Sequence, residues 1–223
     1  DAVSDKIGVV PCGVDLNLFR PLDTAVARRR LGFASDHPIV LFVGRFDSVK
    51  GIDSLIKAMI YLRRRDSLRL VLVGGDGLAS PATRRLQKQA SDLGLQDAVT
   101  FAGRIVQDRL PAYYSAADVL VVPSLYESFG LVGLEALACG TPVVATPVGA
   151  MESILQQGRT GQVVTEAAPR LFAEAIEAFL PNKARKTVSA ADIRASVLQF
   201  SWSKVAAALA AEYVGVCAIG AIS

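Results

Sequence analysis

The sequence is poor in the side chains that most often bind metals or transfer protons in catalysis. Its 223 residues include one histidine, His37, and three cysteines, Cys12, Cys139 and Cys217, which lie far apart and form no Cys-x-x-Cys pair. Histidine-ligated metals and a Ser/His/Asp triad within this chain are therefore nearly excluded. An odd number of dispersed cysteines also argues against a disulfide scaffold or a cysteine-based zinc site, and it favours a reducing, cytosolic setting.

Long apolar runs and a strong charge imbalance are also missing. The longest stretch without a charged residue, 136–151, contains Pro142 and Pro147 and is shorter than the roughly 20 residues that span a bilayer. We therefore expect no transmembrane helix and a cytoplasmic protein, with peripheral membrane association of the full-length protein as an open alternative. The 24 Lys and Arg against 21 Asp and Glu give a net charge of +3, which is too balanced to indicate nucleic-acid binding.

Hydrophobic residues are abundant, by contrast. They make up 52% of the chain, enough apolar surface to offset the entropy of ordering, so a disordered chain is excluded. The length fits one large or two small domains. The chain opens with Asp1, no charged-then-apolar leader follows, and the first methionine is Met59. We interpret the chain as a piece of a longer protein.

Short apolar runs rich in β-branched residues alternate with amphipathic stretches along the chain. Strands are expected at 39–43, 68–73, 99–102, 119–122, 142–145 and 161–164. Helices are expected at 52–59, 81–93, 110–116, 130–140, 171–180, 184–198 and 202–214. This alternation predicts an α/β fold, a Rossmann-like parallel sheet with helices on both faces, in which ligands bind at the carboxyl ends of the strands.

The loop after the first expected strand contains two cations. It reads from Gly44 to Gly51 as Gly-Arg-Phe-Asp-Ser-Val-Lys-Gly, with Arg45 and Lys50 five positions apart. A planar guanidinium and a mobile ammonium together suit a diphosphate. Taken alone, however, this loop favours two solvated surface cations, because exposed Arg and Lys are the norm.

The loop after the strand at 119–122 predicts a phosphate site. Gly130 lets the backbone pass close to a ligand, and the amides of Phe129, Gly130 and Leu131 open a helix whose first N–H groups have no helical partner. That end of a helix carries partial positive charge and binds anions.

Two carboxylates flank this helix start. Glu127 precedes it and Glu135 lies inside it, an offset of eight residues or about 12 Å of helical rise, which is comparable to the distance from sugar to ribose in a nucleoside diphosphate sugar. The alternative interpretation of Glu127 is an acidic residue that only favours the start of the helix. The alternative interpretation of Glu135 is a helix residue that faces solvent. The neighbours of Glu135 are apolar, so we expect it to have a partner and to act in binding.

Other features are weaker signals. Gly-Gly-Asp-Gly at 74–77 is part of no G-x-G-x-x-G or P-loop motif and is expected to form a tight turn. Cys139 is expected to pack in the core, His37 to lie at the surface, and Trp202 and Tyr213 to pack at helical spacing.

Several segments in order resemble one known family. They are "PCGVDLNLFRP", "FVGRFDSVKGIDSLIKA", "LVLVGGDG", "VTFAGRI", "YYSAADVLVVPSLYESFGLVGLEALACGTPVVATPVGAMESI" and "GRTGQVV". Together they resemble the C-terminal, donor-binding half of the group 1 retaining glycosyltransferases with the GT-B fold, over about 7–202. The Glu-x7-Glu element with its Ser-Phe-Gly loop is the most specific part. One departure is Gly149-Ala150, where the family often has Gly-Gly.

The resemblance implies a role for each candidate residue. Arg45 and Lys50 would hold the donor diphosphate and stabilise it as the leaving group. Glu127 would face the donor sugar, and Glu135 would bind the ribose hydroxyls. The backbone of Phe129–Leu131 would receive the distal phosphate.

The remaining implied donor contacts surround these groups. Gly44 would let its loop approach the phosphates, and Ser128 belongs to the Ser-Phe-Gly loop. Arg104 and Ile105, after Gly103, would lie against the nucleobase. The donor would be UDP-, GDP- or ADP-linked, with neither a cofactor nor a metal.

The family also implies a division of the chain and a missing partner. Residues 1–200 would form the donor-binding domain, and 201–223 a C-terminal helix that packs toward an absent N-terminal, acceptor-binding domain. The isolated chain would then bind the donor without transferring sugar. The open alternatives are a GT-B-fold epimerase, a sugar phosphorylase and a non-catalytic nucleotide-sugar-binding module.

Overall fold

A parallel six-stranded sheet forms the centre of the molecule. The computed structural model describes residues 8–34, 37–63, 67–180 and 188–220. The strand order is β3-β2-β1-β4-β5-β6, and every neighbouring pair is parallel. The strands are β1 (Ile39–Gly44), β2 (Arg69–Gly74), β3 (Val99–Gly103), β4 (Val119–Val122), β5 (Val143–Ala145) and β6 (Gly161–Val163). The predicted α/β, Rossmann-like fold is confirmed.

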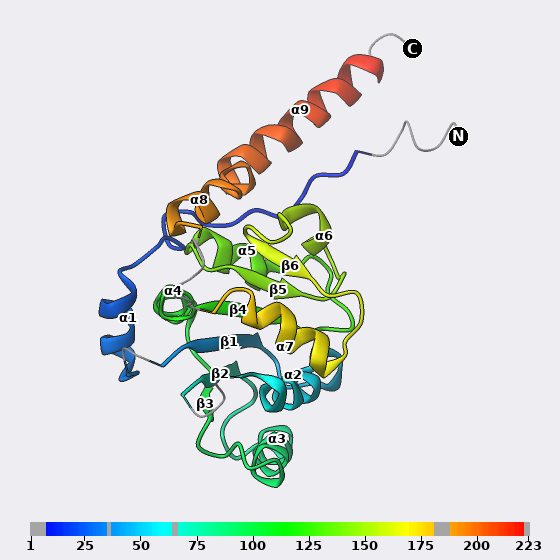
Figure 1. Cartoon of the computed structure of the whole chain (residues 1–223). Helices are drawn as coiled ribbons and strands as arrows, with labels where there is room; N and C mark the ends of the chain where they lie inside the picture. Colours follow the sequence, from blue (N-terminus) through cyan, green and yellow to red (C-terminus); the bar gives the residue numbers. More distant parts are fainter. Residues whose placement is uncertain (1–7, 35–36, 64–66, 181–187, 221–223) are drawn as a thin grey trace.

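Helices follow the strands and cover both faces of the sheet (Figure 1). The α-helices are α1 (Thr24–Leu31), α2 (Ile52–Ala58), α3 (Pro81–Asp92), α4 (Leu110–Ala116), α5 (Leu131–Ala138), α6 (Met151–Ile154), α7 (Pro169–Glu177), α8 (Ala190–Ala195) and α9 (Trp202–Gly220). Short 3-10 turns are η2 (Ser48–Lys50), η3 (Met59–Tyr61), η4 (Gln107–Arg109) and η5 (Leu198–Phe200).

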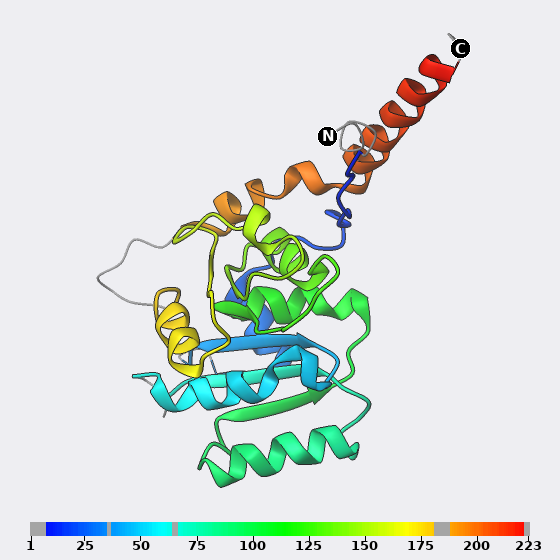
Figure 2. The same ribbon diagram turned by 90° about the vertical axis from the view of Figure 1, so that its right-hand side faces the viewer.

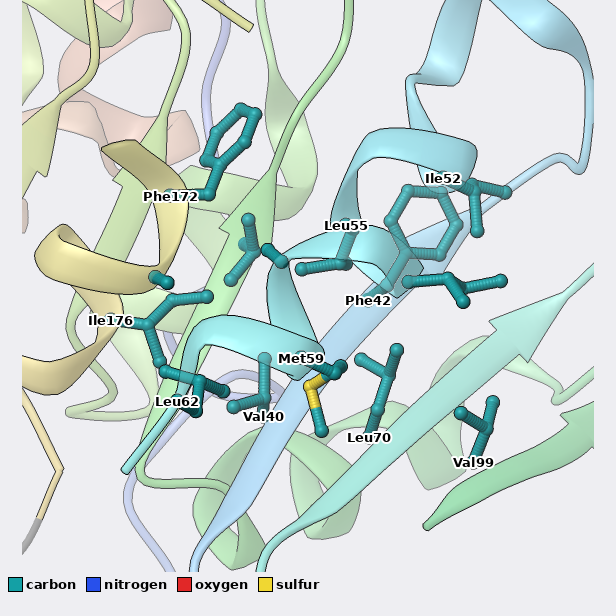
Figure 3. Packing of buried hydrophobic residues seen from close by; sticks show 14 of the residues in the cluster. Val40, Phe42, Ile52, Leu55, Met59, Leu62, Leu70, Val99, Phe172 and Ile176 are labelled. Atoms are coloured by element: carbon teal, nitrogen blue, oxygen red, sulfur yellow. The ribbon is translucent and has the colours of Figure 1, made fainter. Parts of the chain in front are cut away.

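Two apolar cores result from the alternation of side chains along each strand. Val40 and Phe42 of β1 point into the core beneath α2, α3 and α7, which Figure 3 shows with Phe172 and Ile176 of α7. Leu41 points into the opposite core, beneath α4, α5, α6 and α8. Because β1 is buried on both faces, it reads as one continuous apolar run, as parallel strands do.

The C-terminal helices differ from their predicted bounds. The helix expected at 184–198 is the shorter α8, and the part of that prediction at 184–187 lies outside the described residues. Ser189 begins α8 by accepting a hydrogen bond from the Asp192 amide at 3.1 Å. This Ser cap is a start signal that the apolar spacing alone does not contain. Helix α9 begins at Trp202 as predicted but continues to Gly220.

The N-terminal segment lies beside the start of α9 (Figures 1 and 2). The Val14 amide donates to the Phe200 carbonyl at 2.8 Å, and the Trp202 ring lies so close to Gly13 that a Cβ there would contact it. Even so, Trp202 is 56% exposed and Tyr213 65% exposed. The expectation that both aromatic residues pack is wrong for Tyr213, because α9 projects from the rest of the molecule (Figure 2).

The loops after β1 and β4 contact each other at Gly51. This glycine ends η2 and begins α2 with φ of 66°, a left-handed conformation that side chains disfavour. A Cβ at this position would collide with the carbonyl oxygen of Pro123. The Leu125 amide also donates to the Val49 carbonyl at 2.7 Å. The close approach of the two loops therefore requires glycine.

We predict that Gly51→Ala destabilises the fold far more than Gly32→Ala. Gly32 ends α1 with φ of 73°, but among the described residues, its two chain neighbours aside, no atom lies within 4 Å of a Cβ built there. Gly32→Ala should therefore cost about 1–2 kcal/mol from backbone strain alone. Gly51→Ala adds a steric collision and should cost about 3 kcal/mol or more. Chemical denaturation measures both changes, and equal losses would contradict the close contact with Pro123.

Candidate functional site

Most of the candidate residues meet in one cavity. It has a volume of about 400 Å³ and lies where β1 and β4 end at their carboxyl edge. Its walls are Cys12, Val43, Gly44, Arg45, Lys50, Glu127, Ser128, Phe129, Gly130, Leu131 and Val132. The cavity therefore joins the cationic loop after β1 to the glycine loop and helix start after β4.

An ion pair between Lys50 and Glu127 crosses this cavity. The Lys50 Nζ lies 2.8 Å from the Glu127 Oε1, and each side chain is 16% exposed. The buried Ser124 hydroxyl donates to the same oxygen at 2.7 Å. Charge-assisted hydrogen bonds of this length are strong and directional. The carboxylate is therefore held by two donors before any ligand binds.

Arg45 lines the same cavity but remains largely in solvent. Its side chain is 78% exposed and pairs with Asp47, with 3.0 Å between Nη2 and Oδ2. The other carboxylate oxygen of Asp47 is buried and has no hydrogen-bond partner among the described residues. An exposed ion pair of this kind contributes little to stability, so Arg45 is free to exchange Asp47 for an anionic ligand.

The start of α5 faces the cavity with Gly130 as its N-terminal cap, at φ of 90°. The Gly133 amide donates to the Gly130 carbonyl at 3.0 Å, so the amides just before Gly133 have no acceptor within the helix. The Phe129 carbonyl accepts from the Ala150 amide at 2.9 Å, which fixes the loop against α6. The arrangement presents a positive helix end to the cavity.

Glu135 lies one turn deeper in α5, outside the cavity walls. It has the partner expected for a carboxylate among apolar neighbours, because the Tyr114 hydroxyl donates to its Oε2 at 2.7 Å. Burial raises the pKa of Glu135 above its usual 4.5, and hydrogen bonds from Tyr114 and Gln107 partly oppose that rise. Burial also raises the pKa of Tyr114 well above 10, so its hydroxyl stays protonated and donates.

The predicted nucleobase contacts lie apart from the cavity walls. Arg104 and Ile105 follow β3, which is not a neighbour of β4 in the sheet. Arg104 is exposed, and Ile105 packs partly against the core beneath α4 and α5. Their role toward a base, and that of Glu135 toward a ribose, remain predictions.

Sequence reasoning missed some residues of the site and placed others in the core correctly. Cys12 lines the cavity, although its only signal was the turn-like "PCGVD" segment. Ser124 was also missed, because nothing in the sequence marks which oxygen its hydroxyl reaches. Cys139 packs in the core as expected, and burial raises its pKa to about 12.

Two further features, a metal site and a membrane-spanning helix, are absent from the described parts of the chain. No group of three or more His, Cys, Asp or Glu side chains within them could hold a metal ion. None of the helices within them has the length and apolar character needed to cross a membrane.

Comparison with known proteins decides the family. A family model described as "Glycosyl transferases group 1" matches residues 23–194. The chain belongs to this family. The match spans the sheet, both loops of the cavity and helix α5, so the cavity is a feature of a group 1 glycosyltransferase domain.

A curated relative supports the same assignment. The D-inositol 3-phosphate glycosyltransferase of Acidothermus cellulolyticus is 42% identical over 218 residues, which is 95% of this chain and 48% of the relative. This group 1 domain therefore spans about half the length of the curated relatives that it matches.

Solved structures show the same architecture. Sucrose-phosphate synthase from Thermosynechococcus elongatus is 39% identical with a TM-score of 0.84, over 95% of this chain and 53% of that one. Anabaena Alr3699/HepE in complex with UDP-glucose is 26% identical with a TM-score of 0.80, over 93% and 57%. The C-terminal domain of a Francisella tularensis group 1 protein (LpcC), at 24% identity and TM-score 0.67, matches 87% of this chain and 97% of its own. The fold is that of the C-terminal half of a GT-B protein.

We predict that the carboxyl of Glu135 makes stability depend on pH. Because its folded pKa is raised above 4.5, its contribution is fully present below that pH and is lost as the pH rises through the folded pKa. Glu135→Gln keeps an acceptor for Tyr114 but cannot ionise. The melting temperature of Glu135→Gln minus that of the unmodified chain should therefore rise between pH 4.5 and 7. Each kcal/mol of unfolding free energy that the unmodified chain loses over this range corresponds to on the order of 2–4 °C.

The exposed Glu152 of α6 provides the matched control. Glu152→Gln should show no comparable trend in melting temperature over the same pH range. If the difference in melting temperature between Glu135→Gln and the unmodified chain stays constant or falls as the pH rises, the pKa of Glu135 is not raised in the folded state.

Proposed function

We propose that this group 1 domain is the donor-binding half of a retaining glycosyltransferase, which moves a hexose from a nucleoside diphosphate sugar to an acceptor hydroxyl. The single observation that carries this is the cavity shared by Lys50, Glu127 and the positive end of α5. A curated relative is a D-inositol 3-phosphate glycosyltransferase, and a structural neighbour is a complex with UDP-glucose. The relative supports sugar transfer, and the UDP-glucose complex of the neighbour makes a UDP-sugar the first donor to test.

The cavity matches the charges of such a donor. A diphosphate suits Lys50, Arg45 and the open amides at Phe129–Leu131, since a helix N-terminus and side-chain cations favour anions. A sugar carries hydroxyl donors, which suit an acceptor-only carboxylate such as Glu127. The cavity therefore offers cations to the diphosphate and a carboxylate to the sugar hydroxyls.

The proposed reaction breaks the bond between the anomeric carbon and the diphosphate oxygen. The bonding electrons leave with the diphosphate, and Arg45, Lys50 and the helix end stabilise the negative charge that develops there. A new bond forms between the anomeric carbon and the acceptor oxygen, whose proton is released. Glu127 orients the sugar for this step. These groups supply the positive charge themselves, so the proposal gives a metal no role, and it assigns no nucleophile.

The acceptor site would belong to a further domain. The chain covers about half of its curated relatives, and α9 leaves Leu209, Tyr213 and Val214 exposed at 42%, 65% and 70%. We place the N-terminal, acceptor-binding domain against this helix, consistent with a unit of 1–200 followed by a helical extension at 201–223. The chain by itself would then bind the donor without transferring sugar.

We predict that Lys50→Met weakens binding of nucleoside diphosphates by roughly 10–100-fold, the usual range for a lost hydrogen bond to a charged group. Isothermal titration with UDP, GDP, ADP and the corresponding UDP-glucose, GDP-mannose and ADP-glucose measures the affinity and identifies the base. Binding of the free nucleosides should change little, because they lack the phosphates that Lys50 contacts.

Lys57→Met is the matched control, since Lys57 is an exposed cation on α2 outside the cavity. It should bind these ligands as the unmodified chain does. An unmodified chain that binds none of the nucleotides, or equal losses for both variants, would contradict the proposal. Transfer of sugar by residues 1–223 alone would contradict the need for a second domain.

A further inference from the structure

Ser124 is buried directly behind the candidate donor cavity. It is 1% exposed and is not part of the cavity wall. Its hydroxyl reaches the Glu127 Oε1 at 2.7 Å, the oxygen that also accepts from Lys50 at 2.8 Å. Since an ionised carboxylate only accepts, Ser124 must be the donor. Ser124 therefore touches the carboxylate from the protein side while Lys50 touches it from the cavity side.

The backbone of Ser124 is itself fixed to the edge of the sheet. The Thr146 hydroxyl, at the end of β5, donates to the Ser124 carbonyl. The Thr146 amide donates to the Val122 carbonyl of β4 at 3.1 Å. Thr146 is 4% exposed, so this connection is shielded from water. Such a chain of buried hydrogen bonds is rigid and places the Ser124 hydroxyl independently of the ligand.

We propose that Ser124 is a positioning residue, which holds the Glu127 carboxylate toward the donor sugar while Lys50 engages the diphosphate. This inference rests on the proposed function. A diphosphate competes with Glu127 for the Lys50 ammonium, because both are anions within reach of the same cation. The Ser124 hydroxyl lies outside the cavity and keeps its bond to Oε1 when Lys50 turns to the phosphate. Glu127 Oε2, which accepts neither bond, is then the oxygen presented to a sugar hydroxyl.

The mechanism predicts a loss that depends on the sugar. Ser124→Ala should weaken binding of the sugar-linked ligand (UDP-glucose, GDP-mannose or ADP-glucose) by about tenfold. Binding of the matching UDP, GDP or ADP should change less than twofold, since Ser124 does not contact the phosphates. The ratio of the two Kd values, measured by titration on the same protein, is the readout. A general loss of stability would move both affinities together.

Ser115→Ala provides the control for losing a buried hydroxyl. Ser115 is 5% exposed on α4, and its Oγ accepts from the Leu22 amide at 3.1 Å, away from the cavity. It should leave the Kd ratio unchanged. Ser124→Cys keeps a weaker donor of similar size, so its Kd ratio should lie between those of the unmodified chain and Ser124→Ala. It replaces Ser124→Ala in the test if that variant does not fold.

A double-mutant cycle with Glu127→Gln tests whether Ser124 acts through Glu127. Adding Ser124→Ala to Glu127→Gln should change the Kd ratio less than twofold further. Normal donor binding with an unchanged ratio in both Ser124 variants would overturn the inference and leave the proposed function standing. Equal, additive losses in the cycle would overturn it as well. A chain that binds neither ligand class overturns the proposed function and this inference together.

Discussion

The ion pair between Lys50 and Glu127 is the contact on which the site depends. It joins the loop after β1 to the loop after β4, across 77 positions of sequence. Both side chains are mostly withdrawn from water, so each charge needs the other, and removing one partner leaves the second uncompensated. A ligand that carries both an anion and hydroxyl groups can satisfy both members of the pair at once. The contact that orders the cavity therefore also defines the chemistry of the ligand that fits it.

The sheet explains why these two loops meet. Chain order runs outward from β1 in both directions, toward β2 and β3 on one side and toward β4, β5 and β6 on the other. The helices that follow β1 and β4, α2 and α5, pack on opposite faces of the sheet, and such a reversal of strand order leaves a crevice at the carboxyl ends of the two strands. Apolar cores on both faces keep the strands in register, and Gly51 lets the two loops touch. The position of the cavity is therefore a consequence of the topology.

The fold and the main residues of the candidate site follow from local patterns in the sequence. Apolar runs such as 39–43 identify strands because parallel strands are buried on both faces, and Gly130 marks the helix start that faces the cavity. The sequence could not show which partners the charges choose. Arg45 pairs with its neighbour Asp47 and Lys50 with the distant Glu127, a choice made by tertiary packing. Tyr213 looked like a core residue by spacing, yet it is exposed because α9 leaves the body of the domain.

The most direct test is a crystal structure of the chain with the nucleoside diphosphate that binds it most tightly. The account predicts a phosphate oxygen within hydrogen-bond distance of the Lys50 Nζ and the distal phosphate against the amides that open α5. It also predicts that Glu127 keeps its contact with Ser124. A nucleotide bound elsewhere, for example at the glycine turn of 74–77, with Lys50 and the start of α5 untouched, would contradict the account.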